Sequence, residues 1–165
     1  MLDTYTVSFF GHRIITDLHY SKRQLEKIIS NLIQTKDYLE FLIGRNGDFD
    51  ISAAAVIRCC TEKLDLANTT LTLVLPYQTA DLGKNEKYYL AYYDEIEVCS
   101  ASASAHYKAA FSIRNKYMID RSDLVICCIE HTSGGAYKAV EYAISKNKPI
   151  LNTASNSANI SLRKH

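Results

Sequence analysis

Short apolar runs alternate with segments of helical periodicity along most of the chain. Five runs rich in Val, Ile, Leu and Phe end at glycine, proline or polar residues, as buried strands do; they lie at 6–10, 38–43, 71–75, 124–129 and 149–152. Between them, apolar residues recur three and four positions apart, which predicts helices at about 21–33, 50–66, 103–120 and 133–146. Because the strands do not alternate with period two, the pattern predicts an α/β fold: one doubly wound domain with a mostly parallel, five-stranded sheet and helices on both faces.

The pattern is least clear at 77–102 and beyond residue 154. Residues 77–102 contain tyrosines next to acidic residues, and we expect a loop with a short helix there. The tyrosines suit either stacking on a base or burial in a core or dimer contact; they are Tyr88, Tyr89, Tyr92 and Tyr93. Residues 155–165 are largely polar, so we expect a domain at 1–154 followed by a polar C-terminal tail.

Composition narrows the classes of function. With 165 residues, 47% hydrophobic and 22% charged, the chain has the make-up of one ordinary globular domain. Its 19 basic and 18 acidic residues give a net charge of +1, whereas nucleic-acid-binding domains usually carry a large basic excess. The charge therefore argues against nucleic acid as a partner, although a local basic groove is compatible with it. No apolar run reaches the length of a membrane span.

The five cysteines have no ligand spacing. Four of them form two adjacent pairs, Cys59-Cys60 and Cys127-Cys128, and adjacent cysteines are poor disulfide partners. We expect buried free thiols in a reducing compartment, which predicts a cytoplasmic protein. Neither the Walker spacing nor G-x-G-x-x-G is present. We expect no metal and no cofactor.

Candidate ligand-binding residues follow three of the predicted strands. If the strand order is 3-2-1-4-5, the first and fourth strands meet where the order reverses, and their loops face one crevice. Glycine lets a backbone approach a ligand closely, and a helix start offers free N–H groups to a phosphate. The loops are Phe10-Gly11-His12-Arg13, Gly44-Arg45-Asn46-Gly47 and Ser133-Gly134-Gly135. The glycine pairs are also compatible with ordinary tight turns, and His12 with a loop histidine bonded to backbone.

Two helical residues complete the candidate site. Arg114 precedes the fourth strand and would point either toward the sheet edge or into solvent. Glu141 lies two turns into the last helix, where it would meet a ribose hydroxyl or pair with Lys138. Arg13 would fork onto a phosphate, and Phe10 or a tyrosine would stack on a base.

Four segments occur in a fixed order along the chain: Ser8-Phe-Phe-Gly-His-Arg13, Arg114-Asn-Lys-Tyr-Met118, Arg121-Ser-Asp-Leu-Val125 and Gly134-Gly-Ala-Tyr-Lys-Ala-Val-Glu-Tyr-Ala143. This order resembles the SLOG superfamily, the Rossmann-like group that includes the Lonely Guy phosphoribohydrolases. The opening Gly-His-Arg is similar to an uncharacterised bacterial and phage branch of it. The resemblance implies a single Rossmann-like domain that self-associates, so we expect a dimer or higher oligomer.

Lonely Guy enzymes cleave the base–ribose bond of a nucleoside monophosphate with an Arg and a Glu of the motif Pro-Gly-Gly-x-Gly-Thr-x-Glu-Glu. By this resemblance Arg114 holds the place of the Arg, and Glu141 matches the last Glu. Gly134 and Gly135 hold the place of the phosphate-loop glycines.

The sequence departs from that motif at four positions. The Pro, the third Gly, the Thr and the first Glu are replaced by Ser133, Tyr137, Lys138 and Val140. An altered phosphate cradle that lacks one carboxylate favours holding a nucleotide over cutting one, with Lys138 adding charge at a phosphate.

We therefore expect the binding or sensing of a nucleotide or nucleotide-derived ligand, such as an ADP-ribose-like molecule, in a crevice at the carboxyl ends of the strands. The alternative is an N-glycosidase that acts on a nucleoside monophosphate through Arg114 and Glu141. A further alternative is a protein-interaction or regulatory module. The expected partners are a small phosphorylated ligand and further copies of this chain, and neither nucleic acid nor a membrane.

Overall fold

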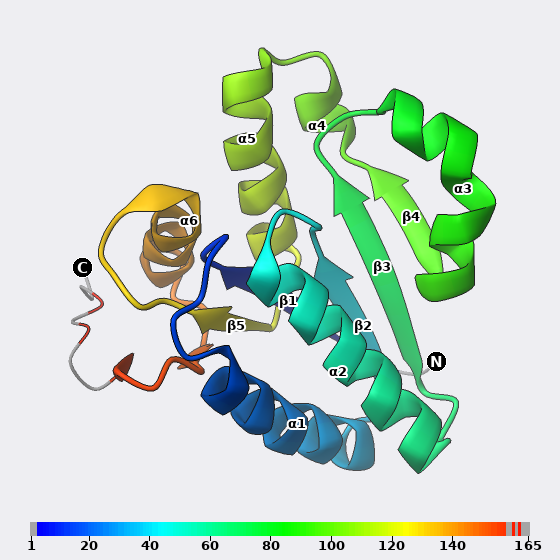
Figure 1. Cartoon of the computed structure of the whole chain (residues 1–165), viewed down its shortest axis with the longest axis vertical. Helices are drawn as coiled ribbons and strands as arrows, with labels where there is room; N and C mark the ends of the chain where they lie inside the picture. The colour runs from blue at the N-terminus through cyan, green and yellow to red at the C-terminus, as the bar shows by residue number, and fades with distance from the viewer. Residues whose placement is uncertain (1–2, 158–159, 161, 163–165) are drawn as a thin grey trace.

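A parallel sheet forms the frame of the fold. The computed structural model describes residues 3–157, 160 and 162. Six strands pair in parallel in the order β4-β3-β2-β1-β5-β6 (Figure 1). The strands are β1 (Thr4–Gly11), β2 (Tyr38–Ile43), β3 (Thr69–Leu75), β4 (Glu95–Val98), β5 (Leu124–Cys128) and β6 (Ile150–Asn152).

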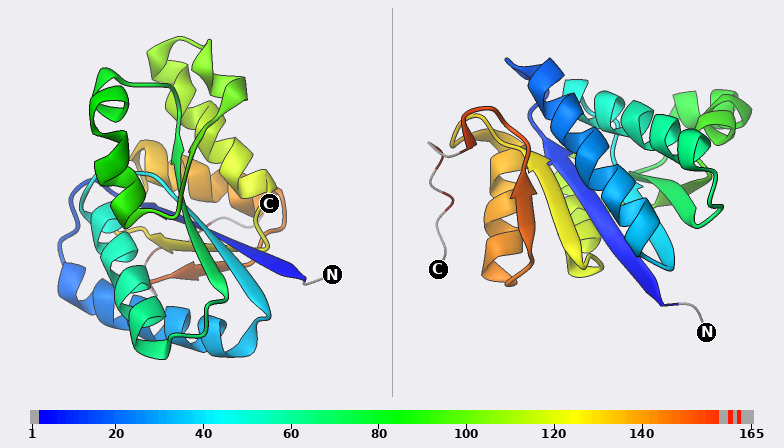
Figure 2. Two further views of the ribbon diagram at one scale, coloured as in Figure 1. Left: turned by 90° about the vertical axis from the view of Figure 1, so that its right-hand side faces the viewer. Right: turned by 90° about the horizontal axis from the view of Figure 1, so that it is seen from below.

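Helices cover both faces of this sheet (Figure 2). The helices α1, α2 and α3 lie on one face, α5 and α6 lie on the other, and the short α4 precedes α5. Their bounds are α1 (Leu18–Thr35), α2 (Asp48–Leu64), α3 (Ala80–Tyr92), α4 (Ser100–Ala103), α5 (Tyr107–Asp120) and α6 (Gly134–Ser145). The doubly wound α/β architecture expected from the sequence is confirmed.

The central strands are apolar on both sides because successive residues enter different cores. In β1, Val7 and Phe9 pack with α1 and α2, whereas Phe10 packs with α5 and α6. In β5, Ile126 belongs to the core beneath α1 and α2, and Cys127 belongs to the core beneath α5 and α6. A strand that is buried on both faces needs a continuous apolar run, which is the pattern that the sequence shows.

The predicted strand order is confirmed, with one strand added at an edge. Strand β4 pairs with β3 outside the five expected strands, so the sheet has six. The expectation of a loop with a short helix at 77–102 is wrong: this segment forms α3, β4 and α4. Helix α3 buries only Leu82 and Tyr89, which leaves too few apolar positions to mark a helix by periodicity.

The first helix also begins earlier than its sequence suggests. Asp17 caps α1 by accepting the backbone N–H of Tyr20 at 3.2 Å. All five cysteines are free, as expected; four of them are buried, whereas Cys59 is exposed. The cysteine pairs therefore contribute to packing rather than to a disulfide.

The proposed tail at 155–165 is described only in part. Residues 158–159, 161 and 163–165 lie outside the described residues. Asn156 donates a hydrogen bond to the carbonyl oxygen of Glu130 at 3.0 Å, and Ile160 and Leu162 pack against the core beneath α6. Within the described part of the chain, no helix is both long and apolar enough to cross a membrane.

Candidate functional site

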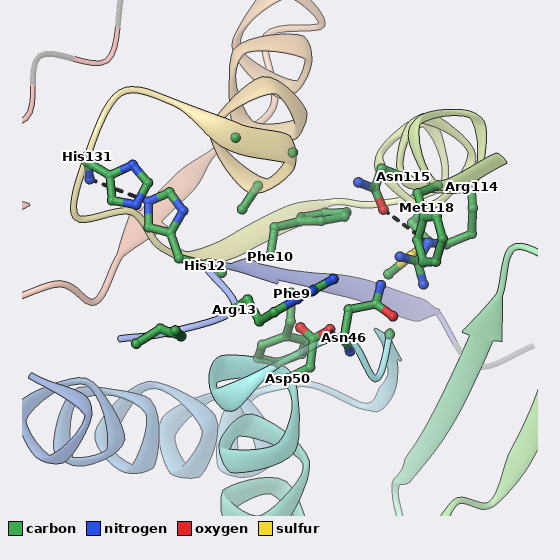
Figure 3. Close-up of a pocket in the computed structure, with 17 residues that line it drawn as sticks. Phe9, Phe10, His12, Arg13, Asn46, Asp50, Arg114, Asn115, Met118 and His131 are labelled. Atoms are coloured by element: carbon green, nitrogen blue, oxygen red, sulfur yellow. Dashed lines mark hydrogen bonds between the residues drawn. The ribbon is translucent and has the colours of Figure 1, made fainter. Parts of the chain in front are cut away.

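A pocket of about 480 Å³ opens at the carboxyl ends of β1, β2 and β5. The chain leaves β1 through α1 to reach β2 on one side, while β5 pairs with β1 on the other, so the pocket lies where the strand order reverses. Loops after all three strands line it, and α5 closes one side (Figure 3). This is the crevice that the strand order predicts.

The pocket collects nine of the residues singled out in the sequence. They come from four separate segments and are Phe10, Gly11, His12, Arg13, Gly44, Asn46, Arg114, Gly134 and Gly135. Six other candidates do not line it: Arg45, Gly47, Ser133, Tyr137, Lys138 and Glu141.

The residues outside the pocket have other surroundings. Arg45 donates to the hydroxyl of Tyr89 at 2.6 Å. Gly47 packs against the backbone of Arg13, which Asp48 also contacts through its N–H at 2.8 Å. Ser133 lies 3.0 Å from Nδ1 of His131, between the hydroxyl oxygen and the ring nitrogen. Two further candidates lie on α6, Lys138 exposed and Glu141 half-buried.

The start of α6 supplies an open helix terminus to the pocket. Gly134 has φ +91°, a backbone conformation that favours glycine, and a β-carbon on Gly134 or Gly135 would meet nothing within 4 Å. The first turn of a helix leaves backbone N–H groups without intrahelical partners and carries partial positive charge. With no acidic residue in that turn to neutralise it, this end of the pocket favours an anion.

Arg114 reaches the pocket from α5 and is buried, with 3% of its surface exposed. Its Nη1 donates to the carbonyl oxygen of Val74 at 2.8 Å, and its Nε donates to Oδ1 of Asn115 at 3.0 Å. Burial lowers the pKa of the guanidinium, and Asp50 opposes that effect. The guanidinium keeps its charge in proteins, so Arg114 places a fixed cation inside the pocket wall.

Asp50 also lines the pocket, although the sequence did not single it out as a ligand-binding group. It lies in the first turn of α2, is 9% exposed, and accepts the N–H of Asn46 at Oδ2, 3.0 Å away. Burial raises the pKa of this carboxyl to about 6, while the Asn46 N–H and Arg114 oppose the rise. A β-carbon on Gly44 would lie 2.7 Å from Nη1 of Arg114 and 3.1 Å from Oδ2 of Asp50, so a glycine is needed between them.

Two histidines join the loops that follow β1 and β5. The rings of His12 and His131 stack with centroids 3.6 Å apart and planes 9° from parallel, and the His131 N–H donates to Nε2 of His12 at 3.4 Å. Burial, followed by the charge of His131, lowers the pKa of His12. Glu130 adds a second tie by accepting the N–H of Thr16 at 2.7 Å. These contacts fix the positions of the two loops relative to each other.

Apolar side chains form the floor of the pocket. Phe10 and Met118 are buried there, and Phe111 lies at its side with its ring 5.6 Å from the Arg114 guanidinium carbon. The tyrosines of 88–93 do not line the pocket: Tyr89 and Tyr93 belong to the core on the opposite face of the sheet. Among the described residues, no group of three or more His, Cys, Asp and Glu is placed to hold a metal ion.

Solved structures share this architecture. The chain is similar to DNA processing protein A from Helicobacter pylori, whose structure is described for its single-stranded DNA binding mode, with TM-score 0.61, 20% identity, 88% of this chain covered and 63% of that one. It is also similar to DNA processing protein A from Streptococcus pneumoniae, with TM-score 0.62, 15% identity and 89% and 49% covered. The fold is Rossmann-like. A molybdenum cofactor carrier protein from Chlamydomonas reinhardtii is a third neighbour, with TM-score 0.56, 13% identity and 94% and 81% covered.

These likenesses concern the fold. No protein-family model and no curated protein sequence matches the chain. The chain spans about two thirds and one half of the two DNA processing proteins. A neighbour of this fold is described for binding single-stranded DNA, so the near-neutral net charge of this chain does not by itself set nucleic acid aside as a partner.

Proposed function

We propose that the pocket binds a small phosphorylated ligand of the nucleotide class, with its phosphate at the start of α6. The observation that carries this proposal is the convergence of an open helix terminus, two arginines and a buried aromatic ring in one cavity. The sequence resemblance to the SLOG superfamily and its Gly-His-Arg branch supports the same class of ligand.

The phosphate and the base of such a ligand each find complementary groups in the lining of the pocket. The N–H groups at the start of α6 suit phosphate oxygens, and the exposed Arg13 at the opposite loop adds a second positive group. Phe10 and Phe111 offer apolar ring surface to a base. A volume of about 480 Å³ falls within the range usual for small-molecule sites, about 300–1,000 Å³.

The geometry favours binding over cleavage by the residues that the resemblance assigns. Cleavage of a glycosidic bond needs a carboxylate next to the reacting carbon, and Glu141 does not line the pocket. Asp50 is the one acidic residue among the described residues that do. The proposal is therefore a binding protein, and Arg114 acts in it as a binding residue.

A charge placed at the start of α6 tests the proposal. Gly135→Asp puts a carboxylate where the phosphate is expected, in space that the structure leaves open. Gly83→Asp is the matched control, because Gly83 also has open space around it and lies on α3, away from the pocket. Gly135→Asn has the same size as the Asp variant without its charge.

The assay is isothermal titration calorimetry with AMP, ADP, ADP-ribose and a short oligothymidylate. We expect at least one of the nucleotides to bind the wild type, with affinity reduced at least about tenfold by Gly135→Asp, less by Gly135→Asn, and little by Gly83→Asp. A carboxylate in the first turn stabilises a helix by about 0.3–1 kcal/mol, so unfolding would not account for the loss. No nucleotide binding at millimolar concentration, or equal loss in both Asp variants, contradicts the proposal; binding of the oligonucleotide alone would assign the site to nucleic acid.

A further inference from the structure

Two buried polar groups in the pocket keep an atom without a partner. Asp50 uses Oδ2 for the Asn46 N–H, and its Oδ1 has no hydrogen-bond partner among the described residues. Arg114 uses Nη1 and Nε for Val74 and Asn115, and its Nη2 has none in the same part of the chain. Both side chains are about nine-tenths buried or more, but neither of these two atoms is among the fully buried atoms that lack a partner, so both can be reached from the pocket.

These two groups face each other without forming an ion pair. The ion pairs among the described residues join Arg58 to Asp94 and Arg121 to Glu40 and Glu97, and none includes Asp50 or Arg114. Gly44 lies next to both side chains, and a β-carbon on it would come within 2.7 Å of Nη1 of Arg114 and 3.1 Å of Oδ2 of Asp50. Figure 3 shows Asp50 rising from the first turn of α2 while Arg114 reaches in from α5.

The chemistry of Asp50 and Arg114 restricts which ligand group can bind to both of them. Asp50 repels a ligand carboxylate or phosphate, and Arg114 repels an ammonium group. A hydroxyl satisfies both residues at once, because its O–H donates to a carboxylate oxygen while its oxygen accepts from a guanidinium N–H. The ribose of a nucleoside 5′-monophosphate carries such hydroxyls at its 2′ and 3′ carbons.

We propose that Asp50 and Arg114 form a sugar-hydroxyl subsite, which selects ribonucleotides over deoxyribonucleotides. This inference rests on the proposed function and extends it: the phosphate lies at the start of α6, and a ribose hydroxyl lies between the two buried side chains. Asp50 is the specificity-determining residue, since its carboxylate accepts the proton of the hydroxyl. A deoxy ligand leaves Oδ1 and Nη2 without partners.

The test compares three nucleotides that differ by one oxygen: AMP, 2′-deoxy-AMP and 3′-deoxy-AMP, titrated at pH 7.5 by calorimetry. The wild type should bind AMP at least about tenfold more tightly than one of the two deoxy analogues, the usual effect of a hydrogen bond to a charged group. Asp50→Asn should weaken AMP binding by a similar factor and remove the preference, because the amide offers a donor where an acceptor is needed. Gly44→Ala should do the same, because its β-carbon would displace Nη1 of Arg114 and Oδ2 of Asp50 from their present positions.

Asp48→Asn is the matched control for Asp50→Asn. It removes the same charge from the same turn of α2 at an exposed position that does not line the pocket, and it should retain the preference for AMP. Circular dichroism verifies that each variant is folded.

The outcomes separate the inference from the function on which it rests. Equal affinity of the wild type for all three nucleotides overturns the hydroxyl subsite and leaves the proposed function standing. A preference for AMP over the deoxy analogues that survives Asp50→Asn also overturns the hydroxyl subsite. Absence of binding by any nucleotide overturns both.

Discussion

Replacing Asp50 by Asn should make the protein more stable at neutral pH. Asp50 is 9% exposed, and burial raises its pKa from the ordinary 3.8 to about 6, despite the opposing Asn46 N–H and the nearby Arg114. The folded protein therefore holds this proton more tightly than the unfolded chain does. As the pH rises from about 4 to about 6 and above, ionisation of Asp50 lowers the free energy of unfolding.

The magnitude follows from the elevated pKa. A tenfold change in an equilibrium constant corresponds to about 1.4 kcal/mol. Raising the pKa of Asp50 by about 2 therefore lowers the free energy of unfolding by about 3 kcal/mol at pH 8, and by only a fraction of that at pH 4. The Asn side chain does not ionise, and its amide oxygen can still accept the Asn46 N–H that Asp50 accepts at 3.0 Å. The variant should thus gain about 2–3 kcal/mol over the wild type between pH 4 and pH 8.

Urea denaturation of both proteins at a series of pH values between 4 and 8 measures this gain. The quantity to follow is the difference in the free energy of unfolding between variant and wild type, because the other titrating groups are common to both. Asp48→Asn removes an exposed charge and should change that free energy by about 0.5 kcal/mol or less. A difference between Asp50→Asn and wild type that does not vary with pH would refute the reasoning.

Two further predictions concern the loops of the pocket. Gly134→Ala should lower the free energy of unfolding by about 1 kcal/mol or more because Gly134 has φ +91°, whereas Gly135→Ala next to it should not; urea denaturation of both variants checks this, and equal effects would contradict it. In NMR titration the His12 imidazole should have a pKa below 6.5, owing to burial and then to His131, and His131→Ala should move it upward. Since the folded state then binds fewer protons than the unfolded chain, the contribution of His12 to stability should fall as the pH drops through that range; a His12 pKa at or above 6.5 would argue against the stacked pair.

The sequence predicted much of the fold because the central strands are buried on both faces and their apolar runs are continuous. It failed at 77–102, where α3 buries only two residues and β4 is a four-residue edge strand with alternating charged positions. Both elements are specified by contacts with the rest of the sheet, through β3 and the core beneath it, rather than by their own periodicity.

Part of the pocket lining could be predicted because glycine-containing loops follow the strands. The glycines at the start of α6 and the loop with Arg13 follow strands, and the strand order brings them together. Burial is not encoded in the same way: an aspartate at the start of a helix is typically a cap, and nothing in its neighbours distinguishes the exposed Asp48 from the buried Asp50. For the same reason the sequence does not decide whether the Arg114 side chain points into solvent or toward the sheet edge. The structure shows that it is buried.

Two of the residues that the resemblance assigns to one site line the pocket, and a third does not. The resemblance placed Arg114 and Gly134 in the same site, and both line the pocket. It placed Glu141 there as well, although that residue does not line the pocket. Asp50 reaches the pocket from the other side of β1 instead, from a helix that the motif does not include.

The central claim is that a phosphorylated ligand binds at the start of α6 and reaches toward α5. A ¹H–¹⁵N NMR titration of the labelled protein with AMP tests it directly. We expect the largest shifts at the backbone amides of Gly134 and Gly135 and at the Nε–H of Arg114. Shifts concentrated on α3, or none at millimolar AMP, would contradict it.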